Sequence, residues 1–235
     1  MLVLLQRSVG IKMALLAVVL SVLAFSSLRY ASEIEASAPD GRIVGNCGAT
    51  GCFGLSPGLV TMPRDCFLAY APGCVGSQLT SDITDIEPAW SPSGRQVAFV
   101  RTLPSSGRNG FPGTYIMVLD TVTGSIRRLT FDDCIELDLP VIGATVLLTS
   151  FDRDPAWSPD EQTIAFTRSY CRKDDEVRQG LGKPAAVVTV SAKGGRVSYF
   201  DPRQPADRVA CGRYHPTFSP DGSVITYVHT ESYSP

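Results

Sequence analysis

The chain has 235 residues, of which 44% are hydrophobic and 19% are charged, and its formal net charge at pH 7 is −2. This composition is that of an ordinary globular protein, and the absence of a basic block argues against a nucleic-acid partner. The 21 Gly and 17 Pro cluster between apolar runs, which is typical of the turns of a β-rich protein.

Residues 1–26 have the features of an export signal. Arg7 and Lys12 precede the apolar run "ALLAVVLSVLAF", and a small-x-small site follows at Ala24-Phe25-Ser26. This pattern predicts a secretory signal peptide, with an uncleaved signal anchor as the alternative. Cleavage would remove two positive charges, leaving 19 against 23 and a net charge of about −4. In either case we expect the rest of the chain to be exported to the periplasm, the cell envelope or the medium.

The segment 27–65 is rich in Cys and Gly. Seven cysteines in an exported protein predict disulfides, and because seven is odd, at least one thiol is free or pairs with another chain. The spacing of Cys47 and Cys52, and of Cys66 and Cys74, is not that of a zinc ribbon, and no His lies near them. Disulfides are therefore the preferred interpretation over zinc.

One phrase occurs three times. Residues 88–101, "PAWSPSGRQVAFVR", match residues 155–168 at eight of fourteen positions, and residues 216–229 are a more diverged copy. Ser-Pro-Asp-Gly favours a type I turn, and the β-branched and aromatic residues after it favour a strand. Each phrase therefore predicts a strand, a tight turn and a second strand. The residues that define the repeat are Pro88, Trp90, Ser91, Pro92, Gly94, Pro155, Trp157, Ser158, Pro159, Asp160, Pro216, Phe218, Ser219, Pro220, Asp221 and Gly222.

A second pair of strands accompanies the phrases. Residues 115–130 and 186–200 each contain two strand patterns joined at a Gly turn, and residues 66–80 have the same form. Four antiparallel strands, A to D, repeated along a chain are the blades of a β-propeller. Within residues 66–235 we expect a half blade at 66–80, blades at 86–130 and 153–200, and a half blade at 214–230.

The repeat resembles the WD40-like repeat of TolB-type β-propellers. The resemblance rests on Pro-x-Trp/Phe-Ser-Pro-Asp-Gly, the Ile-Ala-Phe that follows and the closing Leu-Thr, and it covers about residues 66–230. It implies a propeller of the cell envelope that binds other proteins, although similar blades precede prolyl-oligopeptidase-like catalytic domains and occur in some sugar lyases. No part of the sequence resembles the α/β domain that precedes the TolB propeller.

The predicted units amount to about three blades, whereas closed propellers typically have 4–8. We therefore expect an incomplete propeller, which is a fragment, an open ring or a ring completed by another chain. Its unpaired strand edges predict self-association.

The connections between the predicted strands form two groups, one at each end of the blades. The A–B and C–D turns are tight and share one side, whereas the insertions at 102–114, 131–152, 169–184 and 201–213 share the other. Long loops on one side of a rigid scaffold favour binding there, although tolerated surface insertions are the alternative. Cys134, Cys171 and Cys211 belong to this side, and we expect a disulfide among them, with Cys171–Cys211 favoured.

A hydrolytic site is not indicated. Gly54-Leu-Ser56-Pro-Gly58 matches a nucleophile elbow, but Pro57 lacks the backbone N–H that the oxyanion hole requires. The two histidines, His215 and His229, both fall within the third repeat.

Several recurring side chains have structural interpretations. Asp85 and Asp152 both stand three residues before a repeat proline, so we expect them to cap the turn into strand A and not to bind a metal. The recurring aromatic residues suit packing between blades better than a stacking platform. Arg101 and Arg168 recur as strand-end charges, solvated or paired. Glu161 replaces a turn glycine at a place where φ is expected to be positive.

The sequence therefore predicts an exported, non-catalytic, all-β protein, a partial β-propeller of four-stranded antiparallel blades without cofactor or metal. It binds a protein or ligand through long loops on one face. The alternative is the propeller portion of a prolyl-oligopeptidase-like serine peptidase whose catalytic domain is not in this chain.

Overall fold

The computed structural model describes residues 38, 40–49, 51, 54–69, 75–104, 112–131, 135–139, 144–171, 183–200 and 210–232. All of them belong to the second of two compact units, Glu35–Pro235, the first being Met1–Ile34. The predicted targeting segment lies outside the described residues. Among those residues, no helix has the length and apolar character needed to cross a membrane.

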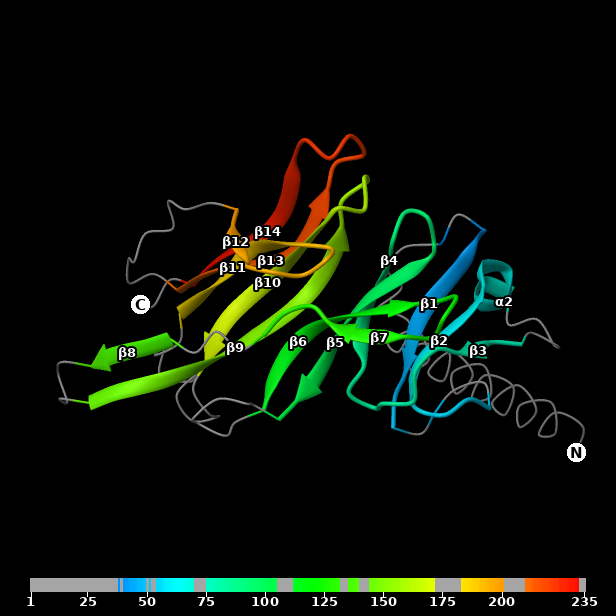
Figure 1. The fold of residues 1–235 in the computed structure, drawn as a ribbon, viewed down its shortest axis with the longest axis horizontal. Helices are drawn as coiled ribbons and strands as arrows, with labels where there is room; N and C mark the ends of the chain where they lie inside the picture. The colour runs from blue at the N-terminus through cyan, green and yellow to red at the C-terminus, as the bar shows by residue number, and fades with distance from the viewer. Residues whose placement is uncertain are drawn as a thin grey trace, which may run out of the picture. The chain divides into compact units, whose positions relative to one another are not determined.

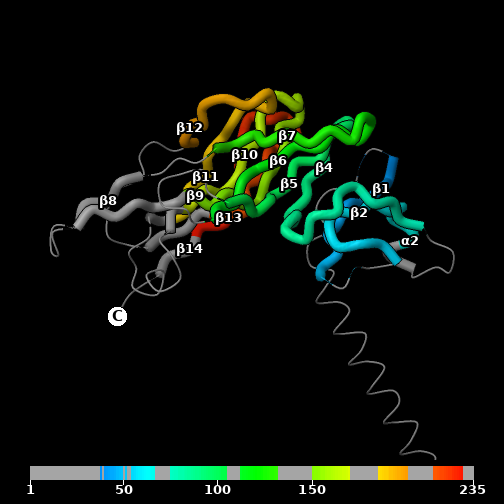
Figure 2. The backbone as a smooth tube through the Cα atoms, turned by 60° about the horizontal axis from the view of Figure 1, so that its bottom comes forward, coloured from blue at the N-terminus to red at the C-terminus, as the bar shows by residue number. Residues whose placement is uncertain are grey.

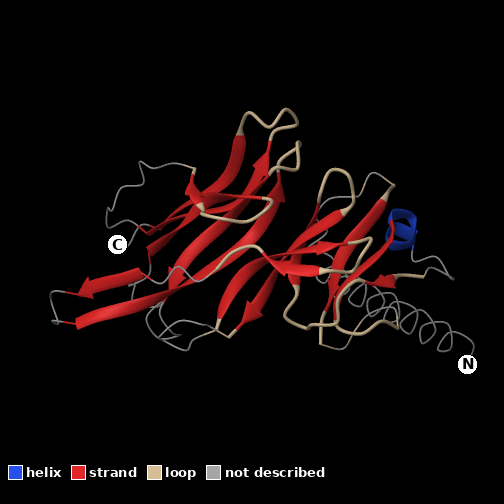
Figure 3. Ribbon diagram, in the orientation of Figure 1, coloured by secondary structure: helices blue, strands red, loops and turns tan. Residues whose placement is uncertain are grey.

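The first described strands form a three-stranded antiparallel sheet, which we call the N-terminal sheet (Figure 1). Its strands, in spatial and chain order, are β1 (Arg42–Cys47), β2 (Gly58–Pro63) and β3 (Ser77–Gln78). A short helix, α2 (Arg64–Ala69), stands between β2 and β3 in the chain, and it is the only helix in the described part (Figure 3).

The next four strands form blade I. They are β4 (Ile86–Trp90), β5 (Gln96–Leu103), β6 (Gly113–Asp120) and β7 (Ile126–Arg128), and each pairs antiparallel with its neighbour in the chain. The β-branched and aromatic residues of β5 and β6 suit a pleated, buried surface. Residues Val97 to Val100 are all fully buried, because sheets cover both faces of the blade.

Blade II repeats this order, and its trace can be followed in Figure 2. Its strands are β9 (Ala144–Trp157), β10 (Thr163–Cys171), β11 (Lys183–Ser191) and β12 (Ser198–Tyr199). The early part of β9 pairs with β8 (Ile135–Leu139), so the predicted insertion 131–152 contains a hairpin. One parallel pair, Thr114 with Phe151, links blade II to β6 of blade I.

The last described strands, β13 (Ala210–Phe218) and β14 (Ile225–Ser232), form a two-stranded antiparallel sheet, the half blade. The structure thus confirms an all-β, partial propeller-like fold built from antiparallel sheets. The insertions are shorter than predicted, because β10 continues to Cys171, β11 begins at Lys183 and β13 begins at Ala210.

The half blade predicted at 66–80 does not begin with a strand. Residues Arg64–Ala69 are helical, with Asp65 in the first turn, where a negative charge favours the positive end of the helix dipole. Their sequence, "RDCFLA", contains no β-branched residue, whereas β2 contains "LVTM". Strand C of this sheet is therefore β2, and α2 is inserted between strands C and D.

The backbone contacts of the N-terminal sheet match those of blade I. In each, the Leu of the closing Leu-Thr donates its N–H to a strand-C carbonyl at 2.8 Å. The N–H of the same strand-C residue donates to the Thr hydroxyl at 3.0 Å. The residues in corresponding positions are Leu59, Leu79 and Thr80 in the N-terminal sheet and Ile116, Leu129 and Thr130 in blade I.

A fourth copy of the repeat turn precedes β1. The N–H of Gly41 donates to the Ala38 carbonyl at 2.9 Å, and the N–H of Ala38 donates to the Arg42 carbonyl at 2.7 Å. The turn of blade I has the corresponding bond from Gly94 to Ser91, at 2.8 Å, and the Ser91 N–H donates to the Gln96 carbonyl at 2.8 Å, so the turn before β1 is one residue shorter. Hence β1, β2 and β3 correspond to strands B, C and D of a blade. The sequence comparison missed this copy because Ala38 stands where the other copies have serine.

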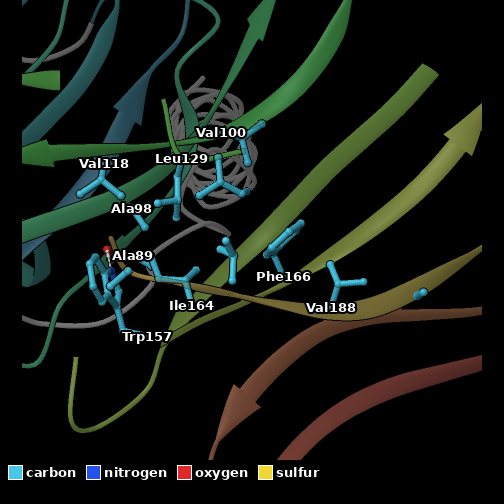
Figure 4. Packing of buried hydrophobic residues seen from close by; sticks show 13 residues of the cluster. Ala89, Ala98, Val100, Val118, Leu129, Trp157, Ile164, Phe166 and Val188 are labelled. Carbon is cyan, nitrogen blue, oxygen red and sulfur yellow. Dashed lines mark hydrogen bonds between the residues drawn. The ribbon is translucent and has the colours of Figure 1, made fainter. Parts of the chain in front are cut away.

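Apolar side chains pack between successive sheets. Trp90 lies in a cluster with residues of β1 and β2, and Trp157 lies in a cluster with residues of β5 and β6 (Figure 4). Phe218 packs against a third cluster, which contains residues of β10 and β11. Each recurring aromatic residue therefore packs against the preceding sheet.

Candidate functional site at the loop side of the inner strands

Antiparallel pairing places the A–B and C–D turns at one end of each blade, which we call the turn side. The B–C and D–A connections are at the other end, the loop side. The connections 105–111, 132–134, 172–182 and 201–209 are outside the described residues. The described part of the loop side consists of the strand residues next to these connections.

The turn side contains the serines of the repeat. The hydroxyl oxygens of Ser91, Ser158 and Ser219 accept the backbone N–H five residues later, at 3.1, 2.9 and 3.0 Å. The N–H three residues later donates to the serine carbonyl in each turn, at 2.8, 2.9 and 2.9 Å. These bonds close the turn and begin strand B.

The other repeat residues divide between the turns and strand A. Glu161 has a φ of 59°, which confirms the left-handed backbone expected from the glycines in the other two copies. Trp90 and Trp157 are 7% and 8% exposed. The exposed turn residues are Pro92, Pro159, Asp160, Pro220 and Asp221, and the buried strand-A prolines are Pro88, Pro155 and Pro216.

An aspartate–arginine pair joins strand A to strand B in each complete blade, with the aspartate three residues before the repeat proline. In blade I, Arg101 Nε and Nη2 donate to the two carboxylate oxygens of Asp85 at 2.6 and 2.7 Å. In blade II, Arg168 makes the same two bonds to Asp152 at 2.7 and 2.8 Å. Such bidentate pairs are geometrically specific. The prediction that these aspartates cap the turn into strand A is wrong, because their carboxylates bind the arginines.

The pair of blade II is deeply buried. The side chains of Arg168 and Asp152 are 1% and 0% exposed. Burial raises the pKa of Asp152, against the opposite effects of the Arg168 guanidinium and of hydrogen bonds from Arg168 and Thr130. The hydroxyl of Thr114, on blade I, donates to the Asp152 carbonyl at 2.8 Å, which links the pair to the neighbouring blade.

In the half blade the corresponding positions are Arg213 and His229, which face each other in the β13–β14 register. The aspartate–arginine pair is therefore a feature of the two complete blades and is not continued in the third copy.

Strand A carries a β-bulge just before each repeat proline. The pairing registers of β4, β9 and β13 all shift at this point. The residues before the prolines, Glu87, Asp154 and His215, have φ values of 52°, 54° and 53°. A positive φ is costly for residues other than glycine, and such positions persist only where surrounding contacts enforce them.

Contacts between neighbouring sheets account for the bulge geometry. The Glu87 carboxylate accepts the backbone N–H of Asp154 at 2.9 Å and pairs with Arg153 at 3.3 Å. The Asp154 carboxylate in turn accepts the backbone N–H of His215 at 3.3 Å, and its other oxygen lies 3.0 Å from His215 Nδ1. Each bulge carboxylate thus receives the bulge N–H of the next sheet. We call these contacts, with Thr167, which donates to Asp154 at 3.1 Å, the bulge series.

Together, the pairs and the bulge series fix the loop-side strand ends. The pairs hold strands A and B together within a blade, and the bulge series holds one sheet to the next. Arg153 and His215 remain 54% and 64% exposed, so polar side chains are also presented to solvent there. Among the described residues, no group of three or more His, Cys, Asp or Glu is placed to hold a metal ion.

The cysteine predictions are only partly accessible. Cys171 ends β10 and Cys211 lies in β13, but neither side chain is described, so their pairing stays a prediction. Cys134 lies outside the described residues. Cys47, at the end of β1, and Cys66, in α2, are each disulfide-bonded. Cys66 thus lies in a helix, whereas the sequence predicts a half blade of strands at 66–80.

Comparisons with known proteins give likenesses of fold only. No model of a known family matches the chain, and no curated protein matches it. Among solved structures, TolB from Acinetobacter baumannii is 19% identical with a TM-score of 0.47, over 83% of this chain and 36% of TolB. Kuenenia stuttgartiensis hydrazine synthase is 18% identical with a TM-score of 0.46, over 81% of this chain and 47% of that one. The chain therefore spans less than half of either protein.

Proposed function

We propose that this chain is an exported, non-catalytic, propeller-like scaffold that binds a protein or ligand at its loop side. Export is supported by the basic and apolar pattern of residues 1–26. A structural role for the charged groups is supported by their contacts, because Asp85, Asp152 and Glu87 bind arginines and backbone N–H groups.

The main support for the proposal is that the same side-chain contacts hold the strands on the loop side in both complete blades. When the strands that a loop joins are held rigidly, the loop loses less conformational entropy on binding a partner. The Arg101–Asp85 and Arg168–Asp152 pairs provide this by joining strands A and B of each complete blade. The A–B turns of the repeat, on the turn side, are short, and Ser91, Ser158 and Ser219 close them locally.

A comparison of the two sides by photo-crosslinking in cells tests this proposal. A photoreactive residue replaces Thr102 or Arg153, which are exposed on the loop side, or Val122, which is 73% exposed in a turn of the opposite side. We expect specific adducts from Thr102 and Arg153 and none from Val122. Equal adducts from both sides, or adducts from Val122 alone, contradict binding at the loop side.

We also propose that the half blade mediates self-association. Among the described strands, β14 pairs only with β13, and Val224 and Val228 are 53% and 50% exposed. An unpaired strand edge with exposed apolar side chains favours pairing with another chain. Light scattering over a range of concentrations tests this, with Val228→Lys expected to shift the protein toward monomer. A monomer at all concentrations contradicts the proposal.

A further inference from the structure

The two faces of the half blade have different surroundings. One face packs against blade II through Phe218, Ile225 and Tyr227. The residues that alternate with these lie on the opposite face and are exposed, and we call this surface the outer face. The outer face consists of Tyr214 and Thr217 on β13 and of Val224, Thr226 and Val228 on β14. All of these side chains are uncharged.

The outer face corresponds to the face of blade I that packs against blade II. Tyr214 faces Val228 in the pairing of β13 with β14. Ile86 faces Val100 at the same place in blade I, just before the same β-bulge. In blade I this face is covered by Trp157 and its neighbours, and Val100 is 0% exposed, whereas Val228 is 50% exposed. A surface that receives a sheet in blade I is therefore exposed in the half blade.

The outer face is more polar than its counterpart in blade I. Two facing threonines, Thr217 and Thr226, take the place of two facing alanines. In blade I the carbonyl of Ala89 accepts the indole N–H of Trp157. In the half blade the Thr226 hydroxyl donates to the corresponding carbonyl, that of Thr217, at 3.3 Å. This carbonyl thus has a donor before any sheet packs on it, and a mixed apolar and polar surface of this kind suits a reversible contact.

The bulge series also differs at the half blade. Glu87 and Asp154 each accept the bulge N–H of the following sheet. His215 occupies the same position, and its Nδ1 lies 3.0 Å from Asp154, so its imidazole is directed back toward blade II. The half blade therefore lacks the carboxylate with which blades I and II hold the sheet that follows. A partner on the outer face must be held by the side chains of the face itself.

A second copy of the chain suits this surface. Two uncharged outer faces can meet without charge repulsion, and such a contact is isologous. In a head-to-tail series, by contrast, the outer face would meet the face of another N-terminal sheet that points away from Trp90. On that face Ile43, Val60 and Met62 are 6%, 2% and 7% exposed, so it is already covered. The described surfaces therefore favour a closed pair over an open series.

We propose that the outer face packs against the outer face of a second copy, in a two-fold symmetric dimer. This inference rests on the proposed self-association of the half blade and specifies the surface that mediates it. The contact is made by the side chains of the outer face and not by backbone pairing along β14. Because the patch is small, we expect a weak association that depends on protein concentration.

Opposite charges at Tyr214 test the proposal in the full-length protein. Tyr214 is on β13, which β14 separates from the open edge of β14, so its side chain tests the face alone. We expect Tyr214→Lys and Tyr214→Glu each to weaken dimerisation at least about tenfold in light scattering, because like charges meet in one contact. An equal mixture of the two variants is expected to regain the dimer. Val122→Lys and Val122→Glu, at an exposed turn, are the matched controls and should dimerise like the parent protein.

A photoreactive residue at Thr226 locates the contact directly. Thr226 is exposed and lies between Val224 and Val228 on the outer face. We expect adducts with β13 or β14 of the second copy, and mixing of isotopically labelled and unlabelled protein identifies them as intermolecular. This measurement uses an unaltered Tyr214, so it decides the question even if the Tyr214 variants fold poorly.

Three results overturn the proposal. A monomer at all concentrations overturns it together with the proposed self-association. A dimer that both Tyr214 variants leave unchanged assigns the contact to another surface, such as the β14 edge, and leaves self-association itself standing. Oligomers that grow beyond two copies, or adducts of Thr226 with the N-terminal sheet, assign a head-to-tail contact instead of a two-fold one.

Discussion

The two aspartate–arginine pairs have the same chemistry and differ in their surroundings. In both blades the partners are sixteen residues apart and form two hydrogen bonds. In blade I, Arg101 is 16% exposed, and Asp82, which is 40% exposed, lies 3.5 Å from it. In blade II the pair is almost fully buried. Both blades therefore have the same two hydrogen bonds, whereas the strand packed beside each pair determines how much the pair contributes to the stability of the fold.

The strand beside the Arg168–Asp152 pair is β6, which belongs to blade I. Its contact with β9 at Thr114 and Phe151 brings the Thr114 hydroxyl onto the Asp152 carbonyl. The pair is buried on that side, so after loss of one charge there is no solvent to compensate the other. In blade I the Asp85 side chain is also 0% exposed, but Arg101 is 16% exposed and Asp82 lies 3.5 Å from it. The same substitution is expected to have unequal effects in the two blades.

The largest effect is expected for Arg168→Met. It removes the guanidinium partner of the buried Asp152 carboxylate, and we expect the free energy of unfolding to fall by about 3–5 kcal/mol. The matched change Arg101→Met is expected to cost less, about 1–2 kcal/mol, because the Arg101 side chain is 16% exposed and its loss opens a path for water to the Asp85 carboxylate. Urea unfolding of both variants measures the difference.

A double change and a pH series sharpen this result. Asp152→Leu combined with Arg168→Met removes both charges, and we expect it to be less destabilising than Arg168→Met alone. The loss in Arg168→Met is expected to shrink at low pH, where Asp152 takes up a proton. Equal losses in the two blades at every pH would mean that burial does not distinguish the pairs.

The second effect concerns the bulge series. Asp154→Ala removes the acceptor for His215 and Thr167 and leaves an alanine at a φ of 54°. We expect a loss of about 2 kcal/mol. Asp154→Asn keeps one acceptor oxygen and a residue that tolerates this backbone, so about 1 kcal/mol is expected. Thermal unfolding in matched buffers ranks the two variants. The same loss for both would show that the left-handed backbone and the acceptor do not contribute separately.

The sequence predicted those features that depend only on residues close together in the chain. Ser-Pro-Asp-Gly determines its own turn, because the serine, proline and glycine each satisfy a backbone requirement within six residues. The strands after it follow from their β-branched and aromatic residues. The left-handed backbone at Glu161 was predictable in the same way, from the glycines at equivalent positions.

The loop-side site was less accessible from the sequence. Asp152 and Arg168 meet because they face each other in the β9–β10 pairing register, which the sequence alone does not specify. Their recurring separation of sixteen residues was a usable signal. The bulge carboxylates bind across two sheets, which no single repeat reveals. Strand β2 was missed because a helix separates it from the Leu-Thr that closes the blade.

The third effect concerns stability at low pH. The pKa shifts of the turn-side carboxylates and of the buried Asp152 carboxylate have opposite directions. Hydrogen bonds from the Ser219 and Ser223 hydroxyls and the Ser223 N–H lower the pKa of Asp221 to about 2, whereas burial raises that of Asp152. A lowered pKa gives stability that is present above the unfolded value of 3.8 and is lost as pH falls toward 2.

We therefore expect Asp221→Asn to be less stable than the parent protein at pH 6 and to approach it near pH 2. The Asp160 turn should behave in the same direction, because hydrogen bonds from the Ser158 hydroxyl and the Gln162 N–H lower its pKa as well. Unfolding midpoints between pH 2 and pH 6 measure the convergence. A constant gap between variant and parent over this range contradicts the assignment.

The smallest effect is expected for Glu161→Gly, where two contributions oppose each other. Glycine relieves a left-handed backbone, a gain of roughly 1 kcal/mol. However, the Glu161 carboxylate also accepts the N–H of Ser93 and, at 3.0 Å, its hydroxyl, and so it connects the turns of blades I and II. These bonds are exposed and worth less than buried ones.

We expect a net stabilisation below about 1 kcal/mol for Glu161→Gly, and a larger one when Ser93→Ala has already removed the hydroxyl bond. Urea midpoints of the four proteins in this cycle give the coupling between Glu161 and Ser93. If the gain is the same in both backgrounds, the Ser93 hydroxyl does not help to connect the two blades.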